Sequence, residues 1–143
     1  MNFKTLYIDM DSFFASIEQQ LDPSLRNKPV AIAAVDNDAG CVVAASYEAK
    51  AYGVKTGTRV HEAKILCPGI NFRQSRHKLY ARYNRYISYL LDSVAELESV
   101  RSIDEFQIYL GDSYSKLSKV IELSMKIKGL IGREVGEEVR LSI

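Results

Sequence analysis

Three acidic residues of this chain could bind a metal ion. Asp9 follows a short apolar run, Leu6-Tyr7-Ile8, whose length and bulk predict a buried strand. Asp104 and Glu105 are adjacent inside an otherwise apolar strand pattern, and neighbouring carboxylates repel each other unless they are exposed or bound to cations. Because adjacent strand residues point to opposite faces, we expect this pair at a bend or strand end, where both can approach one metal pair. Such a site indicates phosphoryl or nucleotidyl transfer.

The pattern changes from strand to helix directly after Asp9. Aromatic and aliphatic residues then recur at helical spacing: Phe13, Phe14, Ile17 and Leu21. We expect Asp11 or Ser12 as the N-cap, with Asp11 favoured, and Asp22-Pro23 as the stop. The first N–H groups of a helix lack intrahelical partners, so this start could hold an anion beside the cation. Taken alone, Asp9 would more often be only a helix cap, and the later acidic pair is what favours the metal site.

The composition is that of an ordinary globular protein of one or two small units, with 143 residues, 47% hydrophobic and 26% charged. The net charge of +1 is unevenly distributed. Every charged residue between Ala63 and Leu91 is basic, whereas the stretch from Asp92 to Glu105 is mostly acidic. A basic segment that leads into an acidic one is expected for a surface that binds a nucleic-acid backbone beside a cation site.

The two cysteines and the apolar runs bear on location. Cys41 and Cys67 are far apart, have no CxxC neighbour and lie in apolar contexts, so we expect buried free thiols in a reducing compartment. No secretion signal is visible, and no apolar run approaches the length of a membrane span. The sequence therefore predicts a cytoplasmic protein without a membrane partner.

The segment that follows the first helix has the pattern of an insertion. Residues 30–35 and 41–45 are predicted strands, and the turn-rich residues 36–40 between them predict a hairpin. Short helices are expected over 46–52 and 59–67, the second capped by Thr58, before a short strand at 70–73.

The rest of the chain predicts a sheet with two long helices. The expected elements are a helix over 76–92, strands at 96–101 and 106–110, a helix over 114–132 closed by Gly132, and a strand at 139–143. Together with the first strand they give the order β, α, β, β, α, β, which is an α/β (α+β) fold of the split-βαβ, ferredoxin-like type with helices on one face. Its first and middle strands are neighbours, so Asp9 can meet the later acidic pair. The last strand pattern is unfinished at Ile143, and we expect the domain to continue.

Four tyrosines recur at every third position of the predicted helix over 76–92, interleaved with arginines: Tyr80, Tyr83, Tyr86 and Tyr89. They could stack on nucleic-acid bases. We favour a helix face that packs on the sheet with its hydroxyls at the edge.

The sequence resembles the Y-family translesion DNA polymerases of the DinB/UmuC superfamily, and most of all the ImpB/MucB/SamB-like branch. The resemblance covers nearly the whole chain through IDMDSFFASIEQQL, KPVAIAA, AASYEAKAYGVKTGTRVHEAKILCPG, SIDE and the tail EVGEEVRLSI. It implies that residues 1–10 and 78–143 are the palm, incomplete at its C-terminus, and 11–77 the fingers, with thumb and little finger absent from this chain. It also implies template-directed DNA synthesis past damaged DNA, with this stretch alone inactive.

The same resemblance implies roles for individual residues. Asp9, Asp104 and Glu105 match the metal-binding catalytic carboxylates, and Met10 would add its carbonyl, for two Mg²⁺ ions that Mn²⁺ can replace. The positions that match nucleotide contacts are Ser12, Phe13, Phe14, Tyr47 and Lys50. Phe14 also matches the steric gate that excludes a ribose 2′-hydroxyl. The candidate contacts to the DNA backbone are Arg73, Arg76 and Lys78, for which a solvated face is an equal alternative.

The chain departs from the family pattern at four positions. Ala44 stands where a hydroxyl residue is common, and Lys50 replaces a more usual Arg. Phe106 and Tyr109 stand where a small residue and an acid are usual. A bulky side chain at position 106 could shift the second metal.

The implied partners are a DNA primer-template and a dNTP, with a sliding clamp or a recombinase filament as further candidates through regions absent from this chain. The implied setting is DNA repair and the SOS response. The alternative is a non-catalytic, Y-family-like accessory protein that binds DNA or repair partners. A phosphohydrolase or cyclase-type palm would use the same metal geometry, but Tyr47, Lys50 and the inserted fingers argue against it.

Overall fold

The computed structural model describes residues 2–35 and 37–143; Met1 and Asp36, the first residue of the predicted turn, lie outside the described residues. The chain divides into two compact units. The first unit combines the N-terminal residues up to Asp11 with Lys78–Ile143, and the second is the inserted segment Ser12–His77. None of the helices in the described ranges has the length and apolar character that a membrane span requires.

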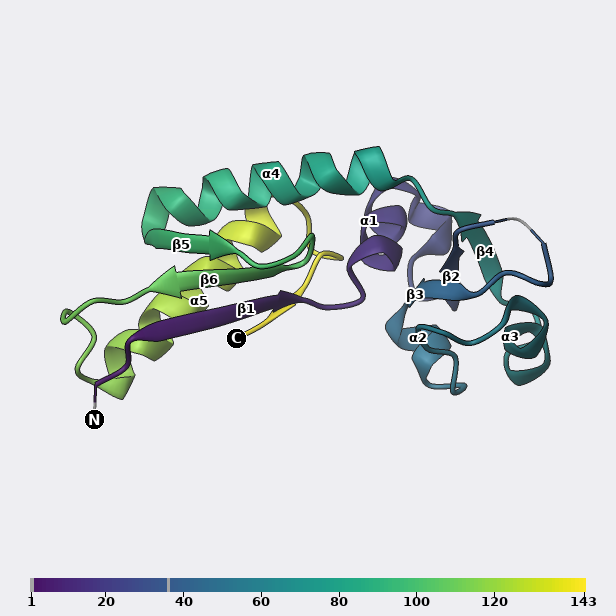
Figure 1. Cartoon of the computed structure of the whole chain (residues 1–143), viewed down its shortest axis with the longest axis horizontal. Helices are drawn as coiled ribbons and strands as arrows, with labels where there is room; N and C mark the ends of the chain where they lie inside the picture. The colour runs from purple at the N-terminus through teal and green to yellow at the C-terminus, as the bar shows by residue number, and fades with distance from the viewer. Residues whose placement is uncertain (1, 36) are drawn as a thin grey trace. The chain divides into compact units, whose positions relative to one another are not determined.

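The first unit contains a four-stranded sheet in the order β5-β6-β1-β7 (Figure 1). The strands are β1 (Thr5–Met10), β5 (Glu96–Val100), β6 (Glu105–Tyr109) and β7 (Leu141–Ser142), and the helices are α4 (His77–Val94) and α5 (Leu117–Glu134). β1 pairs antiparallel with both β6 and β7, and β5 pairs antiparallel with β6. The predicted split-βαβ arrangement is confirmed.

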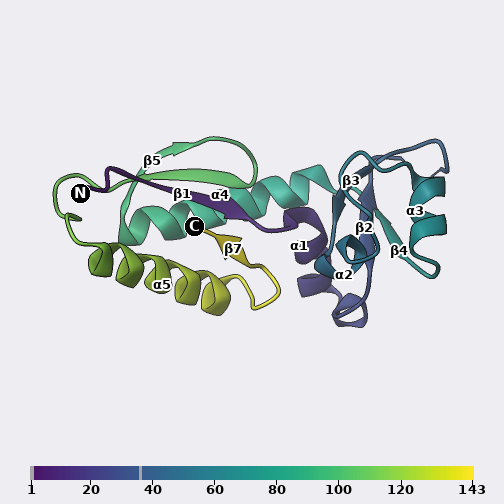
Figure 2. The same cartoon turned by 90° about the horizontal axis from the view of Figure 1, so that it is seen from below.

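The core of the first unit lies between this sheet and the two helices. Along β1, Leu6, Ile8 and Met10 are buried, while Tyr7 between them is 58% exposed. Along β6, buried and more exposed residues alternate in the same way, because successive side chains of a strand point to opposite faces of the sheet. Helices α4 and α5 lie on one side of the sheet (Figure 2), and their buried residues form the core together with those of the strands. The exposed residues of β1 and β6 lie on the other, open face.

Three details of the first unit differ from the sequence predictions. Helix α5 continues past Gly132 and ends at Glu134. Gly136 follows the C-cap, and its φ of 144° suits glycine; its N–H donates to the carbonyl of Ile131 at 3.2 Å. The final strand is shorter than predicted, at two residues. Along α4, Tyr80 is fully buried but Tyr89 is 71% exposed, so the tyrosine row does not form one buried helix face as predicted.

The second unit contains a three-stranded sheet in the order β3-β2-β4. Its elements are α1 (Phe13–Leu21), a 3₁₀ turn (Pro23–Leu25), β2 (Val30–Ala33), β3 (Val42–Ala45), α2 (Tyr47–Lys50), α3 (Val60–Leu66) and β4 (Asn71–Gln74). β2 and β3 pair antiparallel as predicted, and β4 lies parallel to β2. The core combines small residues of the strands and of the short helices, including Ala31, Ala45 and Ala63.

The predicted cap of α3 is wrong. The N-cap residue is Arg59, whose side chain makes no capping hydrogen bond. The hydroxyl of Thr58 accepts a hydrogen bond from the N–H of Lys55 at 3.1 Å instead, which closes the turn before the helix.

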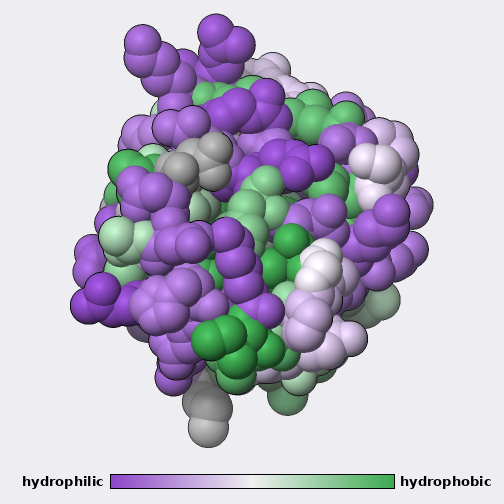
Figure 3. All heavy atoms as spheres, turned by 90° about the vertical axis from the view of Figure 1, so that its right-hand side faces the viewer, coloured by the Kyte–Doolittle hydropathy of each residue, from purple (hydrophilic) through white to green (hydrophobic). Residues whose placement is uncertain are grey.

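The surface of the second unit carries several exposed apolar side chains, of which Ile65 on α3 is 75% exposed. Figure 3 shows the hydrophobic residues on this side as separate patches between polar ones. Scattered exposed hydrophobic residues of this kind are normal on a monomeric protein surface.

The two cysteines lie in different environments. Cys67 is 1% exposed and belongs to the core of the second unit, as predicted. Cys41 is exposed, contrary to the prediction; it lies just before β3 and forms an isolated backbone bridge with Arg59. Burial also raises the pKa of the Cys67 thiol, so less reactive thiolate is present near neutral pH.

We therefore expect the thiols to react at different rates. In the native protein a disulfide reagent such as DTNB should modify one thiol quickly, and Cys41→Ser should abolish that fast phase. Cys67 should react only after denaturation. Two equally fast thiols in the native protein would contradict the burial of Cys67.

Candidate functional site

The three acidic residues that the sequence singled out meet at one edge of the first unit. Asp9, Asp104 and Glu105 each offer a carboxylate oxygen, and these oxygens all lie within 4.8 Å of one another. Asp9 and Glu105 are direct partners across the β1–β6 ladder and both are exposed, while Asp104 is half-buried. We call these three residues the carboxylate cluster.

Backbone pairing and two side chains fix the position of Asp104. It lies in the bend between β5 and β6, as predicted, and its carbonyl accepts a hydrogen bond from the N–H of Met10 at 2.8 Å. The hydroxyl of Ser102 donates to the Asp104 carboxylate at 2.9 Å. The amide of Asn84 on α4 donates to the carbonyls of Ser102 and Ile103 at 3.3 Å and 2.7 Å. Sequence reasoning missed Asn84, because α4 carries several other polar and charged residues and nothing in the pattern distinguishes this one.

The chemistry of the cluster fits a hard divalent cation. Like charges placed directly opposite each other on paired strands are destabilising, as here for Asp9 and Glu105. Mg²⁺ binds carboxylate oxygens at about 2.1 Å, so two oxygens on one ion lie roughly 3–4 Å apart. Small side-chain rotations would bring the observed oxygens to that spacing. A bound cation would thus replace repulsion with attraction.

Phe106 does not crowd the carboxylate cluster. It is fully buried, pairs with Ile8 across the ladder and lies on the core face of β6, opposite to Glu105. Tyr109 is 42% exposed on the open face, at the far end of the strand where it pairs with Thr5. The two departures from the family pattern therefore lie in the core and away from the cluster.

Asp11 is not the cap of α1, contrary to the favoured prediction. The N-cap is Ser12. The Asp11 carboxylate accepts a hydrogen bond from the hydroxyl of Ser142 at 2.7 Å, and its N–H donates to the carbonyl of Arg140 at 2.9 Å. Asp11 thus joins the end of β1 to the segment that enters β7.

The start of α1, in the second unit, has an unusual backbone. Ser12 adopts a left-handed conformation with φ 46° and ψ 44° and makes no side-chain capping bond. Its hydroxyl oxygen is buried and has no hydrogen-bond partner among the described residues. Phe13 is 3% exposed, and Phe14 is half-buried with its ring 6.4 Å from that of His77. An unsatisfied hydroxyl at a helix start is suited to a polar or anionic ligand.

Tyr47 and Lys50 form the first and last residues of α2, and both are exposed. The ammonium of Lys50 lies 5.8 Å from the centre of the Tyr47 ring, within the range of a cation–π contact. Ser46, which is fully buried, places this helix. Its hydroxyl accepts from the N–H groups of Ala49 and Val30 at 3.2 Å and 2.9 Å, so α2 is tied to the start of β2.

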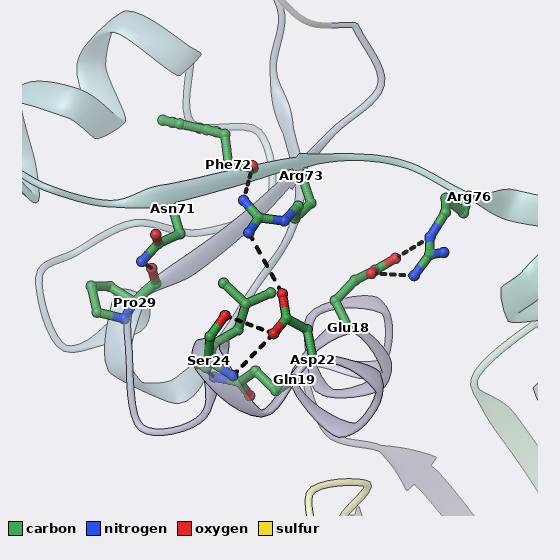
Figure 4. Close-up of polar contacts among 10 residues, drawn as sticks. Glu18, Gln19, Asp22, Ser24, Pro29, Asn71, Phe72, Arg73 and Arg76 are labelled. Carbon is green, nitrogen blue, oxygen red and sulfur yellow. Dashed lines mark hydrogen bonds and ion pairs between the residues drawn. The ribbon is translucent and has the colours of Figure 1, made fainter.

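The candidate DNA contacts differ in their surroundings (Figure 4). Arg76 binds the carboxylate of Glu18 through Nε at 2.8 Å and Nη2 at 2.5 Å. Nη2 of Arg73 lies 3.8 Å from the Asp22 carboxylate, and hydrogen bonds from Ser24 hold the pKa of Asp22 below its usual value. Lys78 is exposed near the start of α4, where the first unit resumes. Arg76 therefore has a structural partner that the sequence did not reveal.

A family model described as the impB/mucB/samB family matches residues 8–143. The chain belongs to this family. Among relatives, it is 31% identical over 140 residues to DNA polymerase IV of Dehalococcoides mccartyi, covering 98% of this chain and 36% of the relative. It is 39% identical over 133 residues to DNA polymerase IV of Moorella thermoacetica, covering 92% of this chain and 33% of the relative. The chain of this family member thus spans about a third of the length of these relatives.

Solved structures show the same fold. The chain matches a Y-family DNA polymerase chimera of Dbh and Dpo4 with a TM-score of 0.89 at 28% identity, covering 98% of this chain and 41% of that chain. It matches the insertion ternary complex of Dbh DNA polymerase with a TM-score of 0.88 at 28% identity and the same coverage. Both units of this family member are included in these alignments, since nearly the whole chain is covered.

The carboxylate cluster predicts a metal-dependent gain in stability. Adding Mn²⁺ at about ten times its dissociation constant should stabilise the folded state by about 1.4 kcal/mol. This corresponds to a rise of roughly 2–6 °C in the melting temperature measured with and without chelator. Asp104→Asn should remove most of the rise.

The matched control is Asp112→Asn, which removes an exposed carboxylate of the same unit that pairs with Lys4 at 2.8 Å. Its own melting temperature can change, but the Mn²⁺-dependent rise should persist. An equal rise in wild type and Asp104→Asn would show that the metal binds elsewhere.

Proposed function

We propose that this protein carries out template-directed DNA synthesis past damaged DNA, by transferring a nucleotide from a dNTP to a primer 3′-hydroxyl. The observation that carries the proposal is the carboxylate cluster, in which one acid from the first strand meets two adjacent acids nearly a hundred residues later, with oxygens within 4.8 Å of one another. Membership of the impB/mucB/samB family and similarity to DNA polymerases IV support it.

In this proposal Asp9, Asp104 and Glu105 are the metal ligands, and Met10 adds its backbone carbonyl. Two bound Mg²⁺ ions, or Mn²⁺ in their place, supply activation of the 3′-hydroxyl and neutralisation of the leaving pyrophosphate. Asp9 and Glu105 are exposed on the face of the sheet opposite to the core, where a substrate can reach them. The hydrogen bonds of Ser102 and Met10 to Asp104 hold that ligand before the substrate arrives.

The second unit contributes nucleotide contacts in this proposal. The backbone N–H groups of Ser12, Phe13 and Phe14 bind the triphosphate, and the buried, unsatisfied hydroxyl of Ser12 supports this role. Tyr47 and Lys50 add a hydroxyl and an ammonium from one exposed helix face. The ring of Phe14 stands against the sugar as a steric gate.

We further propose that residues 1–10 and 78–143 form a palm and residues 11–77 a set of fingers. Lys78 keeps its role as a candidate backbone contact, and Arg73 is a weaker candidate because Asp22 is nearby. A cytoplasmic location, a role in the SOS response, and a sliding clamp or recombinase filament as partner stay predictions.

Primer extension with the protein at its natural length tests the proposal. Wild type should extend a primer on an undamaged template and past a lesion in Mg²⁺ or Mn²⁺. Asp104→Asn should lower kcat by about 10³-fold or more, as expected when charge stabilisation in the transition state is lost. Asp112→Asn is the matched control and should extend normally.

The outcome also separates the alternatives. No extension by the wild-type protein would overturn polymerisation and favour the non-catalytic accessory. Residues 1–143 alone should extend far less than a DNA polymerase IV of full length, because they span about a third of such a relative and would make fewer phosphate contacts to DNA. Comparable extension by both would contradict that expectation.

Phe14→Ala tests the gate. In the same assay the ratio of kcat/KM for a dNTP to that for the matching ribonucleotide should fall by about tenfold or more, which corresponds to about 1.4 kcal/mol of lost discrimination. Use of the dNTP should change less. An unchanged ratio would assign Phe14 to the packing of α1 instead.

A further inference from the structure

Two consecutive residues at the end of the second unit contact the same face of α1. Arg76 binds the Glu18 carboxylate through two nitrogens, at 2.8 Å and 2.5 Å. The His77 ring meets the Phe14 ring at 6.4 Å and an interplanar angle of 83°, an edge-to-face arrangement. Phe14 and Glu18 are four residues apart, so they lie one turn apart on one face of the helix. A single short segment thus holds the Phe14 face of α1 at two points.

The Glu18 contact is the stronger of the two. The Glu18 side chain is only 5% exposed, whereas that of Arg76 is 53% exposed. A buried carboxylate without a counter-charge is unfavourable, so loss of Arg76 would drive Glu18 toward water and displace the helix that carries it. Figure 4 shows the two-nitrogen contact of Arg76 with Glu18, a geometry that fixes direction as well as distance.

The His77 contact acts directly on the ring of Phe14. Edge-to-face aromatic pairs are directional, so His77 restricts the orientation of that ring. The ring of Phe13 is a second aromatic neighbour of Phe14, with centroids 6.0 Å apart and planes tilted by 44°. Because Phe13 is 3% exposed, it forms a fixed support inside the unit.

We propose that Arg76 and His77 are a positioning pair that fixes the Phe14 ring and thereby sets how well the protein rejects ribonucleotides. The inference rests on the proposed polymerase function and on Phe14 as its gate. Neither residue touches the substrate in this proposal. Arg76 sets the position of α1, and His77 sets the orientation of the ring.

Arg73 provides a matched control from the adjoining strand. Its guanidinium approaches the carboxylate of Asp22, the residue that ends α1, at 3.8 Å, and both side chains are more than two-fifths exposed, at 42% and 45%. Asp22 is eight residues beyond Phe14, about 12 Å along the helix axis. Arg73→Ala therefore removes an arginine near the same helix without exposing a buried charge or touching the ring.

The experiment measures kcat/KM for a dNTP and for the matching ribonucleotide with the protein at natural length. Arg76→Ala and His77→Ala should each lower the dNTP-to-ribonucleotide ratio by about 2- to 10-fold, the kinetic equivalent of one aromatic contact. His77→Phe should restore the ratio. Arg73→Ala should leave it unchanged even if DNA binding weakens, because both nucleotides are tested on the same DNA.

Double variants that also lack the Phe14 ring test whether Arg76 and His77 act through that ring. In Phe14→Ala protein, adding His77→Ala or Arg76→Ala should lower the ratio no further. Equal effects with and without the Phe14 ring, or a ratio that Arg76→Ala and Arg73→Ala lower alike, would overturn the positioning role.

A measurement without catalysis keeps this inference distinct from the proposed function. With ¹³C-labelled phenylalanine rings, NMR relaxation should show greater motion of the Phe14 ring in Arg76→Ala and His77→Ala than in wild type and Arg73→Ala. Unchanged ring motion in both variants overturns the inference. If wild type extends no primer but the rings respond as expected, the proposed function fails while the positioning of Phe14 stands.

Discussion

The direct pairing of Asp9 with Glu105 across β1 and β6 is the constraint on which the rest of the first unit depends. Two like charges face each other there, which opposes pairing of the strands. This repulsion is offset by apolar packing on the other face of the same strands, where Ile8 pairs with Phe106 and both are buried. The core thus holds the acids together, and the open face leaves them accessible to a cation.

The loop that carries Asp104 shows how this geometry is maintained. A bend between two strands is free to move unless its backbone groups are bonded. Here Met10 bonds the carbonyl of Asp104, and the Asn84 amide on α4 bonds the two preceding carbonyls. The helix that covers the core therefore also fixes the loop that presents the third carboxylate.

The second unit handles a buried charge differently. Glu18 is removed from water by the packing of α1 and is paired with Arg76, which reaches it from the end of the inserted segment. Only the carboxylate of this pair is buried, so removing Arg76 would take a counter-charge from a group that cannot easily be hydrated where it lies. The small core residues of the same unit, such as Ala45 and Ala49, allow the short helices to approach the sheet closely.

The amino-acid sequence by itself determined the order of the elements and the three acids, because strand and helix periodicities and the change of pattern at Asp9 are local properties. It also located the hairpin of the second unit and the bend at Asp104. It did not identify every helix cap: Ser12, one of its two candidates, is the N-cap of α1, but Thr58 and Asp11 find partners outside the helix starts that their residue types suggest. Nor could it give the exposure of Cys41, the partner of Arg76 or the support from Asn84. These features depend on which residues distant in the chain become neighbours. Only the tertiary structure decides this, because the packing of the two cores brings those residues together.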